Sequence, residues 1–333
     1  MKAIVISREG GPEVLEPREF PTPAPGPGEV RIRVRAAGIN FADLMMRAGR
    51  YVGAPPVPFV PGYEAAGEID ALGEGVLGRK IGDRALAVAK FGGYAEQLVV
   101  PAGRALPIPA GRSFEEAAAL PVNYMTAYHA LHVLGNLRPG GDVLVHQAAG
   151  GVGLAAIELI RLRGGRAIGT ASASKHEFLK GKGLEHAIDY RTEDFEPRVK
   201  ALTGGRGVQL ALDPVGGASF RKSYRCLAPA GLLVSYGLSA ASGGAARAWW
   251  TYLSSGLFSP LQLMLANKGV TGFHLGVFHD EALLAYEMGE LHRLWSEGKL
   301  KPHVGKTFPA EQAADAHRYI HERKNVGKVV LTF

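Results

Sequence analysis

The chain has 333 residues, more than one hydrophobic core usually serves, so two domains are expected. Hydrophobic residues make up 47% of the chain and charged residues 21%, which are the proportions of a soluble globular protein rather than a disordered or membrane chain. No apolar run approaches the roughly 18 residues of a membrane-spanning helix, and the N-terminus lacks a signal-peptide core. We therefore expect an intracellular, cytoplasmic protein.

The formal net charge of +7 raises the question of a polyanionic partner. Basic residues are scattered, and the densest group is Arg161, Arg163 and Arg166, so no nucleic-acid partner is expected. An anionic small ligand explains the charge equally well. The single cysteine, Cys226, excludes an internal disulfide and a multi-cysteine zinc site. We expect it to be a buried, unreactive thiol at a helix end.

The first third of the chain has the pattern of a small, turn-rich β domain. Apolar and polar residues alternate over short stretches, and glycine and proline separate these stretches. The proline-rich connection 20–28 blocks both helix and strand pairing. Strands are expected at 2–7, 29–36, 64–72, 84–89 and 95–100.

The character of the sequence changes at Ser113. Ser113 and Glu116 have capping-box spacing before a helix that continues to Leu120, and a second helix is expected over 126–134, ending at Gly135. From Asp142 onward, strand and helix patterns alternate with short connections, which predicts a parallel sheet covered on both faces. The expected strands are 142–147, 166–171, 187–190, 208–214 and 231–237; the helices between them are 151–163, 175–182, 192–202 and 218–227. Helices over 280–297 and 310–321 and a strand over 328–333 complete the chain.

A glycine-rich turn follows the strand that ends at Gln147. Its residues are Ala148, Ala149, Gly150, Gly151, Val152 and Gly153, with the spacing of the dinucleotide-binding fingerprint and Ala148 in place of the first glycine. Such a turn lets a pyrophosphate approach the backbone and meet the free N–H groups of a helix. A strand precedes the turn and a helix follows it, so we interpret Ala149 to Gly153 as nucleotide-binding.

The end of the next strand predicts which nicotinamide cofactor is bound. Enzymes that use NAD place an acidic residue there to bind the ribose hydroxyls, but no carboxylate lies between Leu159 and His176. The hydroxyl and ammonium groups of Thr170, Ser172, Ser174 and Lys175 are available for a 2′-phosphate instead. These residues therefore favour NADP(H) over NAD(H). The alternative is that Ser172 to Lys175 only cap the following helix.

The glycine turn behind a β domain of this size resembles the medium-chain dehydrogenase/reductase superfamily. Its zinc alcohol dehydrogenases have zinc-ligand cysteine and histidine residues at the positions that match Asn40 and Tyr63 here. Amide and neutral phenol groups are poor zinc ligands, so no metal is expected. Without a Lewis acid, the natural hydride acceptor is an electrophile such as a quinone or an α,β-unsaturated carbonyl.

Further motifs resemble the zinc-free quinone oxidoreductase family, also called zeta-crystallin-like, over essentially the whole chain. They include Ala37 to Asp43, Pro61 to Glu64, Asp213 to Gly217 and Asn325 to Val329. Gly135 to Gly140 and Gly272 to Gly276 are most similar to the vesicle amine transport protein branch. The resemblance implies an α/β fold with a Rossmann domain at 125–267 and a discontinuous GroES-like catalytic domain at 1–124 and 268–333. It also implies a homodimer.

The resemblance assigns roles to individual residues. Lys175 and Tyr190 would lie at the adenosine phosphate, Phe273, His274 and Leu275 at the nicotinamide, and Asn40, Tyr51 and Thr126 at hydride transfer. The remaining nucleotide contacts are Tyr236, Gly237 and Ser239, with Lys328 also reaching the nucleotide.

Structural alternatives stay open for several of these residues. Asn40 could bond its own turn, Tyr51 could pack on the loop that follows it, Thr126 could cap a helix, and Phe273 could belong to the core. His129 and His132, three residues apart, are interpreted as one helix face.

Two functions remain open at this stage. The first is an enzyme that passes a hydride from NADPH to a quinone or enone. The second is an NADPH-binding protein with a mainly non-catalytic role at a membrane or in a complex, suggested by the aromatic-rich segment 240–267 with its adjacent Trp249 and Trp250. A dimer contact or an ordinary packed cover would also account for that segment.

Overall fold

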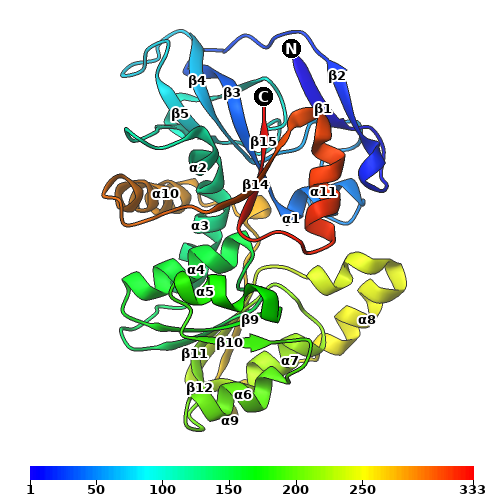
Figure 1. Ribbon diagram of the computed structural model, residues 1–333, viewed down its shortest axis with the longest axis vertical. Helices are drawn as coiled ribbons and strands as arrows, with labels where there is room; N and C mark the ends of the chain where they lie inside the picture. Colours follow the sequence, from blue (N-terminus) through cyan, green and yellow to red (C-terminus); the bar gives the residue numbers. More distant parts are fainter. The chain divides into compact units, whose positions relative to one another are not determined.

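The computed structural model describes residues 1–333, apart from the side chains at positions 243 and 245. The chain divides into two compact units (Figure 1): the first comprises Met1–Asn123 and Met288–Phe333, and the second Tyr124–Glu287. Two helices, α3 (Pro121–Tyr128) and α10 (Glu281–Ser296), contain the points where the chain passes from one unit to the other.

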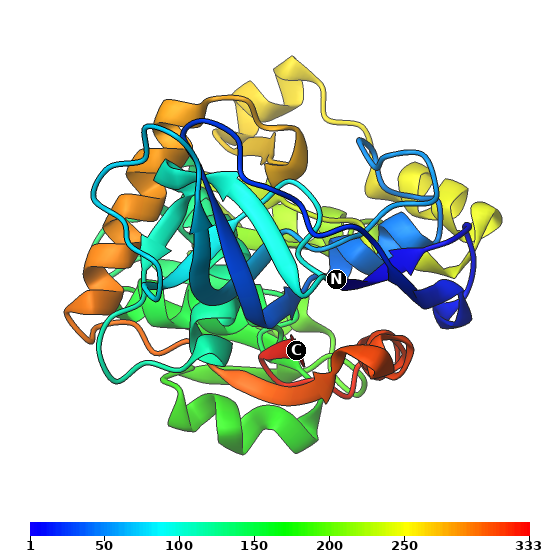
Figure 2. The same ribbon diagram turned by 90° about the horizontal axis from the view of Figure 1, so that it is seen from above.

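The first unit is a β structure built on one seven-stranded sheet, in which the strands follow the order β14-β15-β3-β4-β5-β7 and β6 also pairs with β3. A separate antiparallel pair, drawn in dark blue in Figure 2, forms from β1 (Lys2–Ile6) and β2 (Leu15–Glu19). The strands of the main sheet are β3 (Glu29–Ile39), β4 (Glu64–Leu72), β5 (Arg84–Val88), β6 (Gln97–Pro101), β7 (Ala105–Pro107), β14 (Val304–Pro309) and β15 (Lys328–Thr332). The helices are α1 (Phe41–Arg47), α2 (Phe114–Ala119) and α11 (Ala313–His321). The strands expected in the first third of the sequence are confirmed.

The alternating apolar residues of these strands supply the core of the first unit. Ile32 and Val34 of β3, Ile69 of β4 and Leu331 of β15 lie in one buried cluster. The predicted capping box is present at α2: Ser113 Oγ accepts from the Glu116 N–H at 3.0 Å, and the Glu116 carboxylate accepts from the Ser113 N–H at 3.1 Å. This reciprocal pair explains why α2 begins at Phe114.

The second unit is a parallel six-stranded sheet in the order β10-β9-β8-β11-β12-β13. The strands are β8 (Asp142–Val145), β9 (Arg166–Ala171), β10 (His186–Asp189), β11 (Val208–Asp213), β12 (Leu227–Ser235) and β13 (Gly269–Gly272). The helices are α4 (Gly151–Leu162), α5 (His176–Gly181), α6 (Phe195–Leu202), α7 (Ala218–Arg225), α8 (Ala245–Ser255) and α9 (Pro260–Ala266). All five pairings are parallel, which confirms the doubly wound α/β fold.

One boundary differs from the sequence-based expectation. The sequence predicts a change of domain at 267/268, whereas the compact units of the structure change after Glu287. The physical reason is β13, which pairs with β12 from Leu232↔Gly269 to Ser235↔Gly272 and so extends the parallel sheet. This short strand, with two glycines among its four residues, has no strong strand pattern.

The helix expected over 126–134 is also different. The α-helix α3 ends at Tyr128, and the turns from His129 to Leu134 are π-helical before Gly135. Apolar spacing does not separate the two helix types, and such π segments are frequent at functional sites. None of the helices in the described part of the chain is both long enough and apolar enough to cross a bilayer.

Candidate functional site

The predicted glycine turn connects β8 to α4 in the second unit. Gln147 has a positive φ of 51°, which turns the chain sharply, and Gly150 is the residue before the helix. A Cβ on Gly153 would lie 2.5 Å from the Ala148 carbonyl oxygen and 2.6 Å from that of Gln147. Only glycine therefore fits at 153, and α4 can approach the end of β8 closely enough to present its first N–H groups to an anion.

A buried polar network, which sequence reasoning did not find, holds the carboxyl end of β8. His146 lies 2.9 Å from Thr170 Oγ1 and 2.8 Å from Ser223 Oγ, and the Ser223 hydroxyl donates to Asp213 Oδ2 at 2.9 Å. Burial lowers the pKa of His146, which favours a neutral ring that bridges β9 and α7. Thr170 is thus engaged with His146, which adds a structural role to its expected nucleotide role.

Ser172, Ser174 and Lys175 follow β9, the strand end at which the sequence predicts a 2′-phosphate contact. Ser172 and Ser174 bring their Oγ atoms to 3.4 Å from each other, and Ser172 makes no side-chain cap bond to the 3-10 turn Ala173–Lys175. The side chain of Ser172 therefore does not cap this turn. Tyr190 follows β10, and the Arg191 guanidinium lies 5.9 Å from the centre of its ring. Arg191 is a nearby cation that the sequence argument left unassigned.

The other predicted contacts of this unit lie at or after strand ends. Tyr236 and Gly237 follow β12, and the Gln147 side-chain amide donates to Ser239 Oγ at 2.6 Å, which links the glycine turn to this segment. Burial raises the pKa of Tyr236, so the phenol stays protonated. Phe273, His274 and Leu275 directly follow β13.

A second group of buried side chains surrounds His129. The sequence did not predict it because its members are far apart along the chain. His129 Nδ1 lies 2.7 Å from Glu287 Oε1, and its ring stacks on Phe273 with the centroids 4.0 Å apart. Phe278 contacts the same imidazole edge-on at 5.0 Å. His129 is 2% exposed, so it is not simply part of a helix face as the sequence suggested. Phe273, one of the predicted nicotinamide contacts, is itself held by this histidine, and Thr126 lies one turn earlier on α3.

The first unit contains the polar cluster around Asn40. Lys328 Nζ donates to Asn40 Oδ1 at 2.7 Å, Asn40 Nδ2 donates to Glu64 Oε1 at 2.9 Å, and Lys328 forms an ion pair with Glu64. All three side chains are buried. The side-chain amide of Asn40 is therefore hydrogen-bonded to residues of the neighbouring strands β15 and β4. The backbone N–H of Asn40 donates to Asp43 Oδ2 at 2.7 Å.

A second set of polar residues surrounds Asp43. The Tyr94 hydroxyl donates to Asp43 Oδ2 at 3.0 Å and lies 3.3 Å from His317 Nε2. Burial raises the pKa of Asp43 to about 7, and burial lowers the pKa of His317 to about 3. Asp43 Oδ1 is buried without a hydrogen-bond partner, which disfavours its charged form.

Tyr51 and Tyr63 lie beside each other in an edge-on arrangement, with ring centroids 6.4 Å apart. Burial raises the pKa of both phenols, and their mutual hydrogen bond lowers the pKa of Tyr51 while raising that of Tyr63. This asymmetry is that of a bond in which the Tyr63 hydroxyl donates to the Tyr51 oxygen. Tyr51 packs against the core cluster of the first unit.

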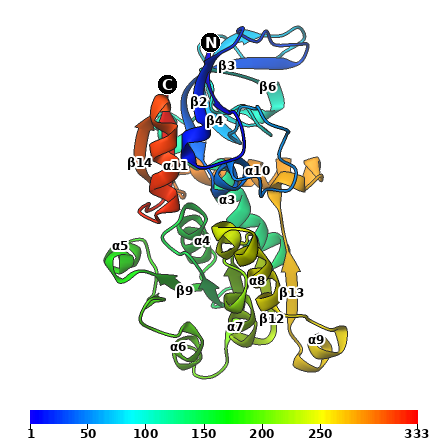
Figure 3. The ribbon, with the colours of Figure 1, turned by 90° about the vertical axis from the view of Figure 1, so that its right-hand side faces the viewer.

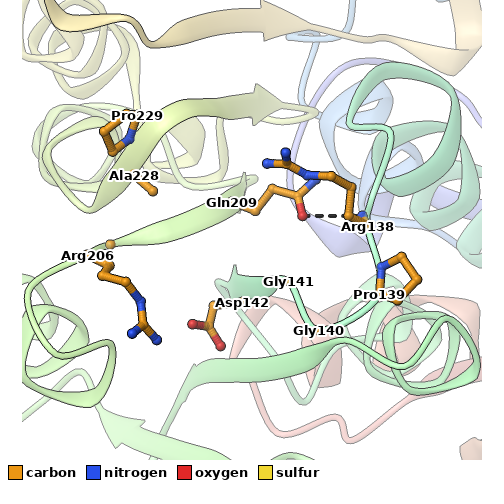
Figure 4. A pocket seen from close by; sticks show the side chains of 10 residues that line it. Arg138, Pro139, Gly140, Gly141, Asp142, Arg206, Gln209, Ala228 and Pro229 are labelled. Carbon is orange, nitrogen blue, oxygen red and sulfur yellow. Dashed lines mark hydrogen bonds between the residues drawn. The ribbon is translucent and has the colours of Figure 1, made fainter.

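A separate pocket of about 290 Å³ lies in the second unit (Figure 4). Its lining residues come from the amino ends of β8, β11 and β12 and the turns before them: Arg138, Pro139, Gly140, Gly141, Asp142, Arg206, Gly207, Gln209, Ala228 and Pro229. Gln209 Oε1 accepts from the Arg138 N–H at 3.2 Å. The glycine turn follows the carboxyl end of β8, so this pocket is not the nucleotide site.

Within the part of the chain that the structure describes, no three or more His, Cys, Asp or Glu side chains are grouped so that they could hold a metal ion. Cys226 is buried at the end of α7, as expected, and burial raises the pKa of its thiol to about 12.

Comparisons with known proteins agree with this geometry. A family model described as "Alcohol dehydrogenase GroES-like domain" matches residues 26–110, and one described as "Zinc-binding dehydrogenase" matches residues 182–331. The human synaptic vesicle membrane protein VAT-1 homolog is 46% identical over 305 residues, 89% of this chain and 77% of that protein. The quinone oxidoreductase-like protein 2 homolog of Nematostella vectensis is 35% identical over 336 residues, 99% of this chain and 88% of that protein.

A solved structure extends the comparison to three dimensions. Escherichia coli quinone oxidoreductase complexed with NADPH matches with a TM-score of 0.87 and 33% identity, covering 100% of both chains. The parallel sheet with its glycine turn, together with the GroES-like match, defines a medium-chain dehydrogenase/reductase. The chain belongs to the zinc-free quinone oxidoreductase-like family of that superfamily, which confirms the resemblance found in its motifs.

Proposed function

We propose that the chain binds NADPH and passes its hydride to a quinone or an α,β-unsaturated carbonyl without a metal. The observation that carries this proposal is the glycine turn, where Gly153 lets α4 meet the end of β8, combined with a β9 end that has hydroxyl and basic side chains and no carboxylate. Family membership makes it an oxidoreductase of this superfamily, and a family member of known structure is described as an NADPH complex.

The residues present fit this cofactor. Ala149, Gly150, Gly151, Val152 and Gly153 would hold the pyrophosphate, because the first N–H groups of a twelve-residue helix lie there and Gly150 and Gly151 have no side chain.

The further contacts fall into two groups. Thr170, Ser172, Ser174, Lys175 and Tyr190 would hold the adenosine phosphate, where an acidic residue would repel it. The nicotinamide end would be lined by Tyr236, Gly237, Ser239, Phe273, His274 and Leu275.

When bound, NADPH supplies the hydride, and the protein must place and polarise the acceptor. Asn40 would donate an amide hydrogen bond to the acceptor oxygen as it gains negative charge, and Thr126 would help to position it. The Tyr51 hydroxyl would deliver the final proton. Its bond with Tyr63 supports this role, because Tyr63 donates to the Tyr51 oxygen and stabilises it as the proton leaves.

Zinc independence is part of the same proposal. The phenol of Tyr63 has a raised pKa, because it is buried, and so would not offer the phenolate oxygen that a metal would need. Purified protein with less than a tenth of an equivalent of zinc should retain its activity after treatment with a chelator.

The experiment for this function is NADPH oxidation with a panel of quinones and enones, together with dissociation constants for NADPH and NADH. We expect turnover with at least one electrophile and tighter binding of NADPH. Tight NADPH binding with turnover of none of the acceptors would reject the catalytic proposal and retain the cofactor assignment.

The exposed face of α8 supports a second candidate function, an NADPH-binding protein with a mainly membrane- or partner-associated role. Trp249, Trp250, Tyr252 and Leu253 are 64–71% exposed, whereas Thr251 between them is 4% exposed. The inner face is small and polar: the Gly217 N–H donates to Ser255 Oγ at 2.9 Å, and Figure 3 shows α8 beside α7. The helix thus presents its aromatic side to solvent, the reverse of an ordinary surface helix.

Liposome flotation distinguishes this second candidate. Loss of lipid binding in a Trp249→Ala/Trp250→Ala variant that still binds NADPH would favour it, and absence of lipid binding in the unmodified protein would reject its membrane form. A homodimer, which such an apolar face would also suit, is proposed from the family resemblance, and sedimentation of both proteins tests it. The cytoplasmic location stays a prediction.

A further inference from the structure

The Lys328 side chain is buried and paired within the first unit, which is not the placement expected of a residue that contacts the nucleotide. It was expected to reach the cofactor, yet it is 2% exposed, its Nζ donates to Asn40 Oδ1 at 2.7 Å, and it pairs with Glu64. Asn40 Nδ2 in turn donates to Glu64 Oε1 at 2.9 Å. The three side chains close a ring of polar contacts within the first unit.

This ring determines which end of the Asn40 amide is oxygen. An ammonium group can only donate and a carboxylate can only accept, so Lys328 must face the amide oxygen and Glu64 must face the amide nitrogen. A flipped amide would set two donors against each other on one side and two acceptors on the other. The contacts therefore define one orientation of Asn40 by chemistry alone.

The strands around Asn40 are built to accept this arrangement. β15 pairs with β3 through Val329↔Ile39, so Lys328 enters beside Asn40, while β4 begins at Glu64 on the other side of β3. Gly38 lies between them, and a Cβ there would fall 2.5 Å from Glu64 Oε1 and 2.6 Å from Lys328 Cε. The glycine makes room for both charged groups.

Glu64 is itself fixed on its second oxygen. Its Oε2 accepts from the Val122 N–H at 2.8 Å, at the first turn of α3, where helix N–H groups favour negative charge. With Glu64 and Lys328 satisfied by these contacts, the second hydrogen of Asn40 Nδ2 has no acceptor among the residues that the structure describes. That hydrogen is available to a ligand.

We propose that Lys328 and Glu64 are positioning residues that hold the Asn40 amide with its second N–H free for the acceptor oxygen, and that Lys328 does not bind the nucleotide. This inference rests on the proposed function, which gives Asn40 its role. Lys328 also pulls electron density through the amide oxygen, which makes the remaining N–H a stronger donor.

A double-mutant cycle tests the proposal. Asn40→Ala should lower kcat by roughly 10²–10³-fold, as for removal of one oxyanion donor, and Lys328→Met should lower it by at least about tenfold. Because Lys328 acts through Asn40, adding Lys328→Met to Asn40→Ala should change kcat by no more than about threefold. Additive losses would overturn the proposal, as would an unchanged kcat in folded Lys328→Met protein.

Cofactor affinity separates positioning from nucleotide binding. The NADPH dissociation constant of Lys328→Met should stay within about threefold of the unmodified value, whereas loss of a phosphate contact would weaken NADPH by tenfold or more and leave NADH unchanged. Lys328→Arg, which keeps the charge, should recover part of kcat. The control is Lys306→Met, an exposed lysine on the neighbouring strand β14, which should leave both constants unchanged.

A double variant and an NMR measurement complete the test. Lys328→Met/Glu64→Gln removes both charges at once, so the combined variant avoids an unpaired buried charge if Lys328→Met alone does not fold. The side-chain ¹⁵N resonances of Asn40 report the amide directly: one hydrogen should exchange slowly and one quickly, and the difference should vanish without Lys328. If the Asn40 resonances are identical in the Lys328→Met variant and the unmodified protein, the proposal is overturned, even if no acceptor is ever reduced. If the resonances differ but none of the acceptors is reduced, only the proposed function is rejected.

Discussion

Adding one methyl group at Gly153 is the most specific perturbation of the nucleotide turn. A Cβ there would lie 2.5 Å from the Ala148 carbonyl oxygen, 2.6 Å from that of Gln147 and 2.7 Å from the Ala148 carbonyl carbon. All three atoms belong to the backbone, so no side-chain rotation relieves the overlap. Overpacking of this kind costs about 1–3 kcal/mol, and moving α4 away from β8 also displaces the N–H groups that would bind the pyrophosphate.

The same energy range sets the expected affinity change. If the whole cost of displacing α4 appears as a loss of binding free energy, about 1–3 kcal/mol corresponds to a roughly 5- to 150-fold higher dissociation constant for NADPH. Fluorescence titration measures the constant, and urea unfolding measures the free energy of unfolding. Gly181→Ala is the matched control, since a Cβ there meets nothing within 4 Å and it also lies in the second unit. A Gly153→Ala variant with unchanged affinity and unchanged unfolding would refute the reasoning.

Other perturbations probe separate parts of the structure. Lys175→Ala should weaken NADPH binding by about 1.5–3 kcal/mol and leave NADH binding unchanged, as measured by titration of both; equal losses would place Lys175 away from the 2′-phosphate. Burial raises the pKa of Asp43 from its ordinary 3.8 to about 7, so the folded state holds a proton that the unfolded state has released, and this carboxyl makes the protein less stable as pH rises from about 4 to 7. Urea unfolding of Asp43→Asn should show a flatter pH dependence over that range; an identical slope would contradict it. Because burial raises the pKa of Cys226 to about 12, thiol-reactive dye at pH 8 should label unfolded protein quickly and native protein at least about a hundredfold more slowly, while comparable rates would show an accessible thiolate.

Local patterns were enough to predict much of the fold. The strand β9 has the bounds expected from Arg166–Ala171, and β4 those expected from Glu64–Leu72, because a short apolar strand flanked by glycine and polar residues carries its own signal. The glycine turn was also recognisable, since its constraint lies within six consecutive residues. Each of these features depends on neighbours along the chain.

The polar clusters could not be predicted in the same way. Lys328 and Asn40 are 288 positions apart, and His129 and Glu287 are 158 apart, so no local spacing connects them. The pairing of β15 with β3 brings Lys328 beside Asn40, a contact that no sequence pattern indicates. The buried partners of such charges become visible only when strand order and register are known.

Segment 245–255 shows a different limit of sequence reasoning. Two adjacent tryptophans indicate that one aromatic ring must leave any core face, but the pattern does not show which side of the helix packs. In the structure the glycine pair Gly216 and Gly217 lets the small side of α8 approach: a Cβ on Gly217 would lie 3.0 Å from Ser254 Oγ. This close approach of the small side of α8, which is a tertiary property, leaves the aromatic side facing outward.

Transfer of a labelled hydride tests the central claim most directly. In separate reactions, the protein is incubated with an α,β-unsaturated ketone and with NADPH that carries deuterium at either the pro-R or the pro-S position of C4, and the product is analysed by mass spectrometry and NMR. The account predicts one deuterium at the β-carbon from one of the two labelled forms and none from the other, in protein free of zinc. A reduced product without deuterium from both forms, or deuterium transfer only after zinc is added, would contradict it.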